Sequence, residues 1–205
     1  MTVTDITPIT KSRYRIVLDE ELTFVLYKGE MNRLHIRRGE EIMEDTYLRI
    51  FHEILPKRAK LRCMNLLQSK DYTHRQLEDK LKQGDYPKEI IDEAIAYVES
   101  YGYVDDEKYV RNFIEYNSDK KSRIRIENDL MRKGIRRELI GKVFGELQES
   151  GTEIDEITMI QNLLNKKNYN SQSATDEERR RMYAFLSRKG FRSDVIGRAL
   201  LLDIT

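Results

Sequence analysis

The chain has 205 residues and is highly charged at 36%, but its 37 lysines and arginines nearly balance its 36 aspartates and glutamates. The formal net charge of +1 therefore excludes a uniformly basic or acidic protein. Aromatic and branched residues are too frequent for a disordered chain. A hydrophobic content of 39% together with the high charge is typical of small helical units that expose much surface.

The sequence contains no segment suited to crossing a membrane and no pair of cysteines. No apolar run approaches the roughly 20 residues that span a bilayer, and residues 1–11 lack the apolar core of a signal peptide. Cys63 is the only cysteine, so no intrachain disulfide can form. We therefore expect a cytoplasmic protein that does not bind membranes, with Cys63 as a small core residue rather than a nucleophile.

Residues 1–40 differ in pattern from the rest of the chain. Tyr14–Leu18 and Leu22–Leu26 are short runs rich in strand formers, separated by three acidic residues. They predict a β-hairpin, although its turn lacks the Asn-Gly or Asp-Gly signal. Because a lone hairpin is only marginally stable, we expect it to pack on the helix that begins near Asp45.

Between the hairpin and that helix, Leu34 and Ile36 predict one further short strand. From Asp45 onward we expect helices almost without interruption. Pro56 is expected to open one of them, because proline is tolerated in a first turn. Capping boxes and N-cap residues mark most other starts, which we place at Thr73, Pro87, Asp105, Ser122, Asp155, Thr175 and Ser193.

An internal repeat is the strongest pattern in the sequence. Its clearest copy has Ile126 and Leu130 on one helical face, Gly134 at a helix-ending turn, and Ile135 in apolar contact with Leu130. Ile140 then starts the apolar stripe of the next helix. Every offset recurs in a second copy at Met182, Leu186, Gly190, Phe191 and Ile196. The apolar offsets also recur at Leu77, Leu81, Tyr86 and Ile91, where Asp85 takes the turn position.

These patterns predict a mainly α-helical fold of three tandem three-helix repeat units, preceded by a small N-terminal β-hairpin module. One unit has too small a core to be very stable alone, so we expect the units to stack into an elongated molecule, straight or curved. The predicted divisions are a hairpin-and-helix module at residues 1–55 and repeat units at residues 56–104, 105–151 and 152–205.

Residue types that carry catalysis or bind metals are scattered along the chain. His35, His52 and His74 lie apart and at no recognised metal-binding spacing, and the glycines form no phosphate-binding loop. Asp105 and Asp106 suggest paired catalytic carboxylates, but a helix N-cap followed by an acidic first-turn residue explains them better. We therefore expect no enzymatic activity, no cofactor and no metal.

Positive charge is concentrated in one segment. Residues 120–142 hold nine basic and three acidic residues, a surplus of six that leaves the rest of the chain net negative by five. A solvated helix face is the simpler explanation, and a binding surface for phosphates or acidic proteins is the alternative. With a parallel cluster in the third unit, the candidate partner-binding residues are Lys120, Lys121, Arg123, Arg125, Arg132, Lys133, Arg136, Arg137, Arg188 and Lys189.

Two segments resemble a known family. The run Gly102, Tyr103, Val104, Asp105, Asp106 is similar to the Gly-Tyr-Leu-Asp-Asp signature of RecX regulatory proteins, with valine in place of leucine. Leu130, Gly134 and Ile135 lie in a segment that resembles the family's Leu-Lys-x-Lys-Gly-Ile sequence. The hairpin region also resembles the extra N-terminal module of longer family members, and the family's fold consists of tandem three-helix units.

The resemblance implies a regulator of RecA, the recombinase that forms filaments on single-stranded DNA. Family members bind that filament, generally in its helical groove, and inhibit strand exchange, ATP hydrolysis and co-protease activity in DNA repair and the SOS response. They have no catalytic residues or cofactor of their own. We therefore expect a monomer that binds the RecA filament, and as an alternative activity a weak, mostly electrostatic binding of single-stranded or double-stranded DNA.

Overall fold

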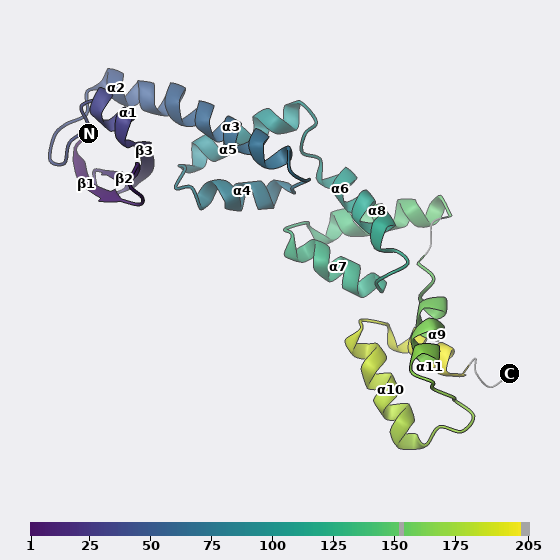
Figure 1. The fold of residues 1–205 in the computed structure, drawn as a ribbon. Helices are drawn as coiled ribbons and strands as arrows, with labels where there is room; N and C mark the ends of the chain where they lie inside the picture. The colour runs from purple at the N-terminus through teal and green to yellow at the C-terminus, as the bar shows by residue number, and fades with distance from the viewer. Residues whose placement is uncertain (152–153, 202–205) are drawn as a thin grey trace. The chain divides into compact units, whose positions relative to one another are not determined.

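The computed structural model describes residues 1–151 and 154–201. The chain groups into two compact units, Met1–Asp105 and Asp106–Thr205. Within the described residues, strands occur only near the N-terminus, and helices occur in both units and make up most of the second (Figure 1). The predicted fold class, three-helix units preceded by a small β module, is confirmed, whereas the stacking of those units stays a prediction.

The N-terminal module is an antiparallel sheet of three strands, β1 (Val3–Pro8), β2 (Arg13–Leu18) and β3 (Leu22–Tyr27), in that order. The predicted hairpin is the pair β2–β3, and its turn holds Asp19 and Glu20 at φ values of 48° and 65°. Strand β1 adds to this hairpin by pairing along β2, with Val3 buried. Its short run ends at a proline, which weakens the strand signal in the sequence.

The strand expected at Leu34 and Ile36 is wrong. Helix α1 (Lys28–Arg33) follows β3 directly, and the backbone N–H of Tyr27 donates to the Glu30 carboxylate at 2.8 Å, which stabilises the helix start. The chain leaves α1 through His35, whose φ is 53°. Ile36 is buried as a single apolar side chain rather than as part of a strand.

Pro56 does not open a helix as expected. It lies inside one continuous helical run made of α2 (Glu44–Leu48), the π-helical segment η1 (Arg49–Ile54) and α3 (Leu55–Leu67). Proline cannot donate to the carbonyl four residues earlier, and its ring crowds that carbonyl. The wider turns of η1, directly before Pro56, accommodate the missing hydrogen bond and allow the helix to continue.

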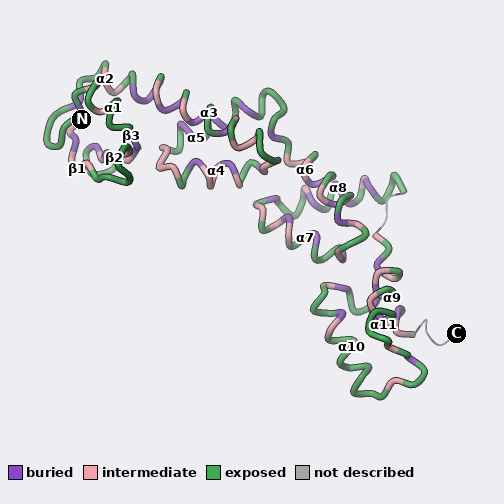
Figure 2. Tube along the Cα trace, in the orientation of Figure 1, coloured by how far each residue is buried: buried purple, intermediate pink, exposed green. Residues whose placement is uncertain are grey.

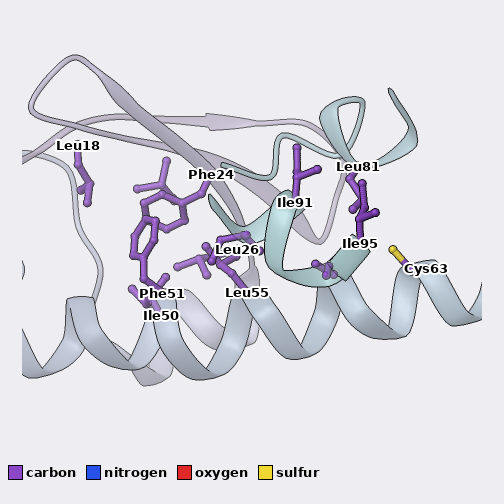
Figure 3. Packing of buried hydrophobic residues seen from close by; sticks show 14 of the residues in the cluster. Leu18, Phe24, Leu26, Ile50, Phe51, Leu55, Cys63, Leu81, Ile91 and Ile95 are labelled. Atoms are coloured by element: carbon purple, nitrogen blue, oxygen red, sulfur yellow. The ribbon is translucent and has the colours of Figure 1, made fainter. Parts of the chain in front are cut away.

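The sheet and the first helices share one hydrophobic core, so the hairpin packs on the predicted helix (Figure 3). Phe24 of β3 meets Phe51 edge-on, with ring centroids 5.1 Å apart and planes at 76°. Arg58 of α3 reinforces this contact by donating to the carbonyl of Val25 and pairing with Glu30 at 3.1 Å. Cys63 is fully buried in the same core, and burial raises the pKa of its thiol to about 11.

The first repeat consists of α3 with α4 (His74–Lys82) and α5 (Lys88–Ser100). The capping box of Thr73 and Gln76 is present at the start of α4, and the predicted apolar stripe of α5 is buried. Buried positions recur along these helices between exposed ones (Figure 2). The predicted division at residues 55 and 56 falls within the shared core and stays a prediction.

The second compact unit contains two further repeats with separate hydrophobic cores. The second repeat consists of α6 (Asp106–Asn117), α7 (Arg123–Arg132) and α8 (Arg137–Glu149). The third consists of α9 (Glu156–Lys166), α10 (Asp176–Arg188) and α11 (Ser193–Leu201). Five of these six helices begin at or beside the residue predicted to start them, including the capping box of Thr175 and Glu178, and no start was predicted for α8.

The internal repeat is confirmed by one backbone turn that occurs in all three units. Asp85, Gly134 and Gly190 each occupy the left-handed region, at φ values of 55°, 87° and 87°. The next residue then donates its N–H to the carbonyl five positions earlier, from Tyr86 to Leu81, Ile135 to Leu130 and Phe191 to Leu186. This is the Schellman hydrogen bond, so the repeated glycine and apolar offsets are explained by helix termination.

Candidate partner-binding surface

The start of α7 contacts the turn between α10 and α11. The Ser122 hydroxyl accepts from the N–H of Arg125 at 3.4 Å as the predicted helix cap, and it donates to the carbonyl of Lys189 at 3.1 Å. Gly190 makes this approach possible, because a Cβ at that position would lie 2.8 Å from the Ser122 oxygen. The second and third repeats are therefore in direct contact at Ser122.

Glu156 provides a second contact at the same helix end. Its carboxylate accepts from the N–H of Arg123, the first residue of α7, at 2.7 Å, and its side chain is almost fully buried. Burial raises the pKa of Glu156 above its ordinary value, despite the opposing effects of the Arg123 N–H and of the Arg192 charge. A carboxylate at a helix N-terminus is stabilised by the free N–H groups there.

Beside these contacts lies a hollow of about 720 Å³, which we call the basic hollow. Its cations come from both repeats, and Asp119 is the acidic residue of the lining. The lysines and arginines that line it are Lys120, Lys121, Arg125, Lys166, Arg188 and Lys189.

The structure thus brings together five of the ten predicted partner-binding residues, namely Lys120, Lys121, Arg125, Arg188 and Lys189. Lys166 was not among the candidates, because it lies in α9, far in sequence from both basic clusters. A search for cations at helix C-termini would have found it, since it is the basic residue of the last turn of α9. Within the described residues, neither Lys166 nor Arg188 forms an ion pair.

Part of the positive charge near the basic hollow is balanced by Asp129. Its carboxylate lies 2.9 Å from Lys121, 3.9 Å from Arg125 and 2.7 Å from Arg132. Burial alone would raise the pKa of Asp129, but the Lys121 hydrogen bond and the three cations together hold it below its ordinary value. Lys121, Arg125 and Arg132 are therefore partly neutralised by this one carboxylate.

The remaining predicted residues do not line the basic hollow. We call Arg132, Lys133, Arg136 and Arg137 the turn group, because they flank the turn between α7 and α8. The ammonium of Lys133 lies 5.5 Å from the Phe113 ring centroid, and Arg137 contacts the sulfur of Met131. Arg123 points elsewhere, pairing with Glu127 at 3.0 Å over the ring of Phe144.

The residues of the family-like signature have structural roles. Gly102 ends α5 at a φ of 69°, and Tyr103 donates its N–H to the carbonyl of Val98. Asp105 precedes α6, which begins at Asp106, as the capping explanation requires. Leu130 and Ile135 are buried on either side of the left-handed Gly134.

Metal sites and membrane-spanning helices are two further features that would bear on function. No group of three or more metal-ligating side chains there is placed to hold a metal ion. None of the helices in residues 1–151 and 154–201 is both long and apolar enough to cross a membrane.

The fold and this surface define a helical-repeat protein with a cation-lined hollow. Three family models match the chain: the first three-helix domain of RecX at residues 59–97, the second at 105–143 and the third at 154–200. The chain belongs to the RecX family.

Relatives agree with this assignment, and solved structures agree with the fold. The chain is 32% identical to the regulatory protein RecX of Caldanaerobacter subterraneus, over 93% of each chain. It is 27% identical to that of Clostridioides difficile, over 92% of this chain and 88% of the relative. A crystal structure of a regulatory protein RecX matches with a TM-score of 0.60 at 20% identity, over 95% of this chain and 96% of the other. RecX from Lactobacillus salivarius matches with a TM-score of 0.61 at 20% identity, over 74% of this chain and 98% of the other.

Proposed function

We propose that this chain binds the RecA filament on single-stranded DNA and inhibits its strand exchange, ATPase and co-protease activities. It does so in the cytoplasm, as a monomer and without catalysing a reaction. Membership of the RecX family, over nearly the full length of its relatives, is the observation that carries this proposal.

The basic hollow supports a binding role and suggests which residues carry it. It is concave, it combines cations from two repeats, and Lys166 and Arg188 form no ion pair within the described residues. Desolvated pairs formed by such cations contribute more to binding than pairs on an open rim. We therefore assign the basic hollow to the partner contact.

The proposal is tested by adding the purified chain to the cognate RecA on single-stranded DNA and measuring ATP hydrolysis and strand exchange. We expect both rates to fall as the chain approaches the filament in concentration. The double variant Lys166→Gln with Arg188→Gln should inhibit both activities only at higher concentrations than the wild-type chain. Unchanged rates at saturating concentrations of the wild-type chain would refute the proposal.

Direct DNA binding is the second candidate function, favoured by the six cations of the basic hollow. A polyanion that neutralises several of them would release counterions, so its affinity should fall steeply with salt. Titration of labelled single-stranded and double-stranded DNA from low to physiological salt measures this dependence. Absence of binding at low salt would exclude this second function.

A further inference from the structure

The basic hollow continues into a second hollow of about 750 Å³ in the third repeat. The two share Lys166, Phe185 and Arg188 as lining residues, and we call them together the trough. The second hollow adds two cations, Lys167 and Arg181. Its acidic residue, Glu178, accepts the N–H of Thr175 at 2.8 Å in the capping box, and this hydrogen bond lowers its pKa.

The floor of the trough is apolar and only partly covered. Met159 and Leu163 lie four residues apart on α9, so they share a helical face, and Met182 and Phe185 lie three apart on α10. All four are half-buried. Helices α9 and α10 both pack on α11, which secures the third-repeat core and leaves this floor between them.

Two of the cations contact the aromatic ring of the apolar floor. The Lys167 ammonium lies 4.6 Å from the Phe185 ring centroid, and the Lys189 ammonium lies 5.7 Å from it. Methionine side chains adapt to apolar partners of different shape. The trough therefore combines an adaptable apolar floor with a basic rim.

We propose that the trough binds an acidic amphipathic helix of a protein partner. Carboxylates on the helix would pair with the rim cations, and its apolar face would cover Met159, Leu163, Met182 and Phe185. A nucleic-acid backbone would match the charge but would leave this apolar floor unused. The inference rests on the proposed function, because it names the kind of partner segment that the basic hollow contacts.

The test uses the full chain and a fluorescein-labelled amphipathic peptide of glutamate and leucine, about 16 residues or ~24 Å long as a helix. A peptide of the same composition with its leucines spread around the helix is the control probe, and a thymidine oligonucleotide is a third probe. We expect the amphipathic peptide to bind about tenfold more tightly than the control peptide, a difference of roughly 1.4 kcal/mol.

Two double variants separate floor from rim. Met159→Gln with Met182→Gln should weaken the amphipathic peptide about tenfold and change oligonucleotide affinity by less than about twofold. Lys166→Gln with Arg188→Gln should weaken both probes, and Arg136→Gln with Arg137→Gln should weaken neither. Circular dichroism and the thermal midpoint verify that each variant is folded.

Equal affinity for the two peptides, or insensitivity of peptide binding to the methionine variant, would overturn the inference. If the oligonucleotide then bound most tightly, the trough would be a phosphate-binding path instead. Filament binding by the same variants keeps the two proposals distinguishable. Filament binding without peptide binding refutes only the inference, whereas peptide binding without any effect on the filament refutes the proposed function.

Discussion

The turn group and the basic hollow contain residues of the same chemistry in different surroundings. The turn group flanks one helix terminus, where Arg132 pairs with Asp129 and Lys133 lies against aromatic rings. The basic hollow instead collects cations from α7 and the loop before it, from α9, and from the end of α10 and the turn after it, around one concave surface. Proximity in sequence made the turn group the more conspicuous candidate, but concavity and shared lining make the basic hollow the better candidate for a binding surface.

Gly190→Ala should cause the largest loss of stability among the single substitutions. The substitution strains a residue at a φ of 87° and places a Cβ 2.8 Å from the Ser122 oxygen. We expect a loss of about 2–3 kcal/mol, from the left-handed strain and the disturbed helix cap. Urea unfolding followed by circular dichroism measures this loss.

Gly102→Ala is the matched control for that substitution. Gly102 also lies in the left-handed region, at a φ of 69°, but nothing lies within 4 Å of an added Cβ. Only the backbone strain of about 1 kcal/mol should appear. Equal losses for the two glycines would mean that the contact between Gly190 and Ser122 contributes nothing.

Asp129→Asn should lower the stability of the chain and raise its affinity for a polyanion. Removing the carboxylate should cost about 1 kcal/mol of stability, and the release of Lys121 and Arg125 should raise the affinity for a polyanion about twofold to threefold. Because the folded pKa of Asp129 is lowered, its stabilisation is present above its ordinary pKa and is lost as pH falls through the folded value. The stability difference between wild type and variant should therefore vanish in acid.

Asp119→Asn is the control for Asp129→Asn, because it also removes one carboxylate charge. Asp119 lines the basic hollow, but Lys121 and Arg125 keep their ion pairs with Asp129 when Asp119 is replaced. Stability should then change by less than about 0.5 kcal/mol. A stability loss from Asp119→Asn as large as that from Asp129→Asn would contradict the role assigned to the Asp129 ion pairs.

Glu156→Gln should have a small effect with a defined pH dependence. The folded pKa of Glu156 is raised, so the wild-type chain loses stability as pH rises from the ordinary glutamate pKa through the folded value. Glutamine keeps an acceptor for the Arg123 N–H without the charge. At neutral pH the variant should be about 0.5 kcal/mol more stable than wild type. Thermal unfolding of both chains across this pH range measures the difference. A difference that does not change with pH would contradict the raised pKa of Glu156.

Arg136→Gln with Arg137→Gln should have the smallest effect. Both side chains are exposed and lie outside the lining of the basic hollow. Stability should change by less than about 0.5 kcal/mol, and polyanion affinity by less than about twofold. A larger loss of affinity in a salt titration would return the turn group to the binding surface.

Local chemistry explains what the sequence predicted well. Thr73, Ser122 and Thr175 start helices because their side chains satisfy free N–H groups. Gly134 and Gly190 end helices because they tolerate positive φ. These signals depend on residues within one or two turns, so a single segment contains them.

Non-local contacts explain what the sequence did not predict. Strand β1 is stabilised by pairing with β2, and Val3 is buried in a core that includes residues of helices distant in sequence. Pro56 continues a helix because the preceding turns widen, which no capping pattern signals. Lys166 joins the basic hollow only because the third repeat contacts α7, and Glu156 contacts the start of α7 only because its carboxylate accepts a hydrogen bond from the Arg123 N–H.

The central claim is that the basic hollow, rather than the turn group, contacts the RecA filament. It is tested most directly by measuring filament affinity for two folded double variants, Lys166→Gln with Arg188→Gln and Arg136→Gln with Arg137→Gln. We predict about tenfold weaker binding for the first and less than about twofold change for the second. Equal losses, or a larger loss for the second, would contradict the account.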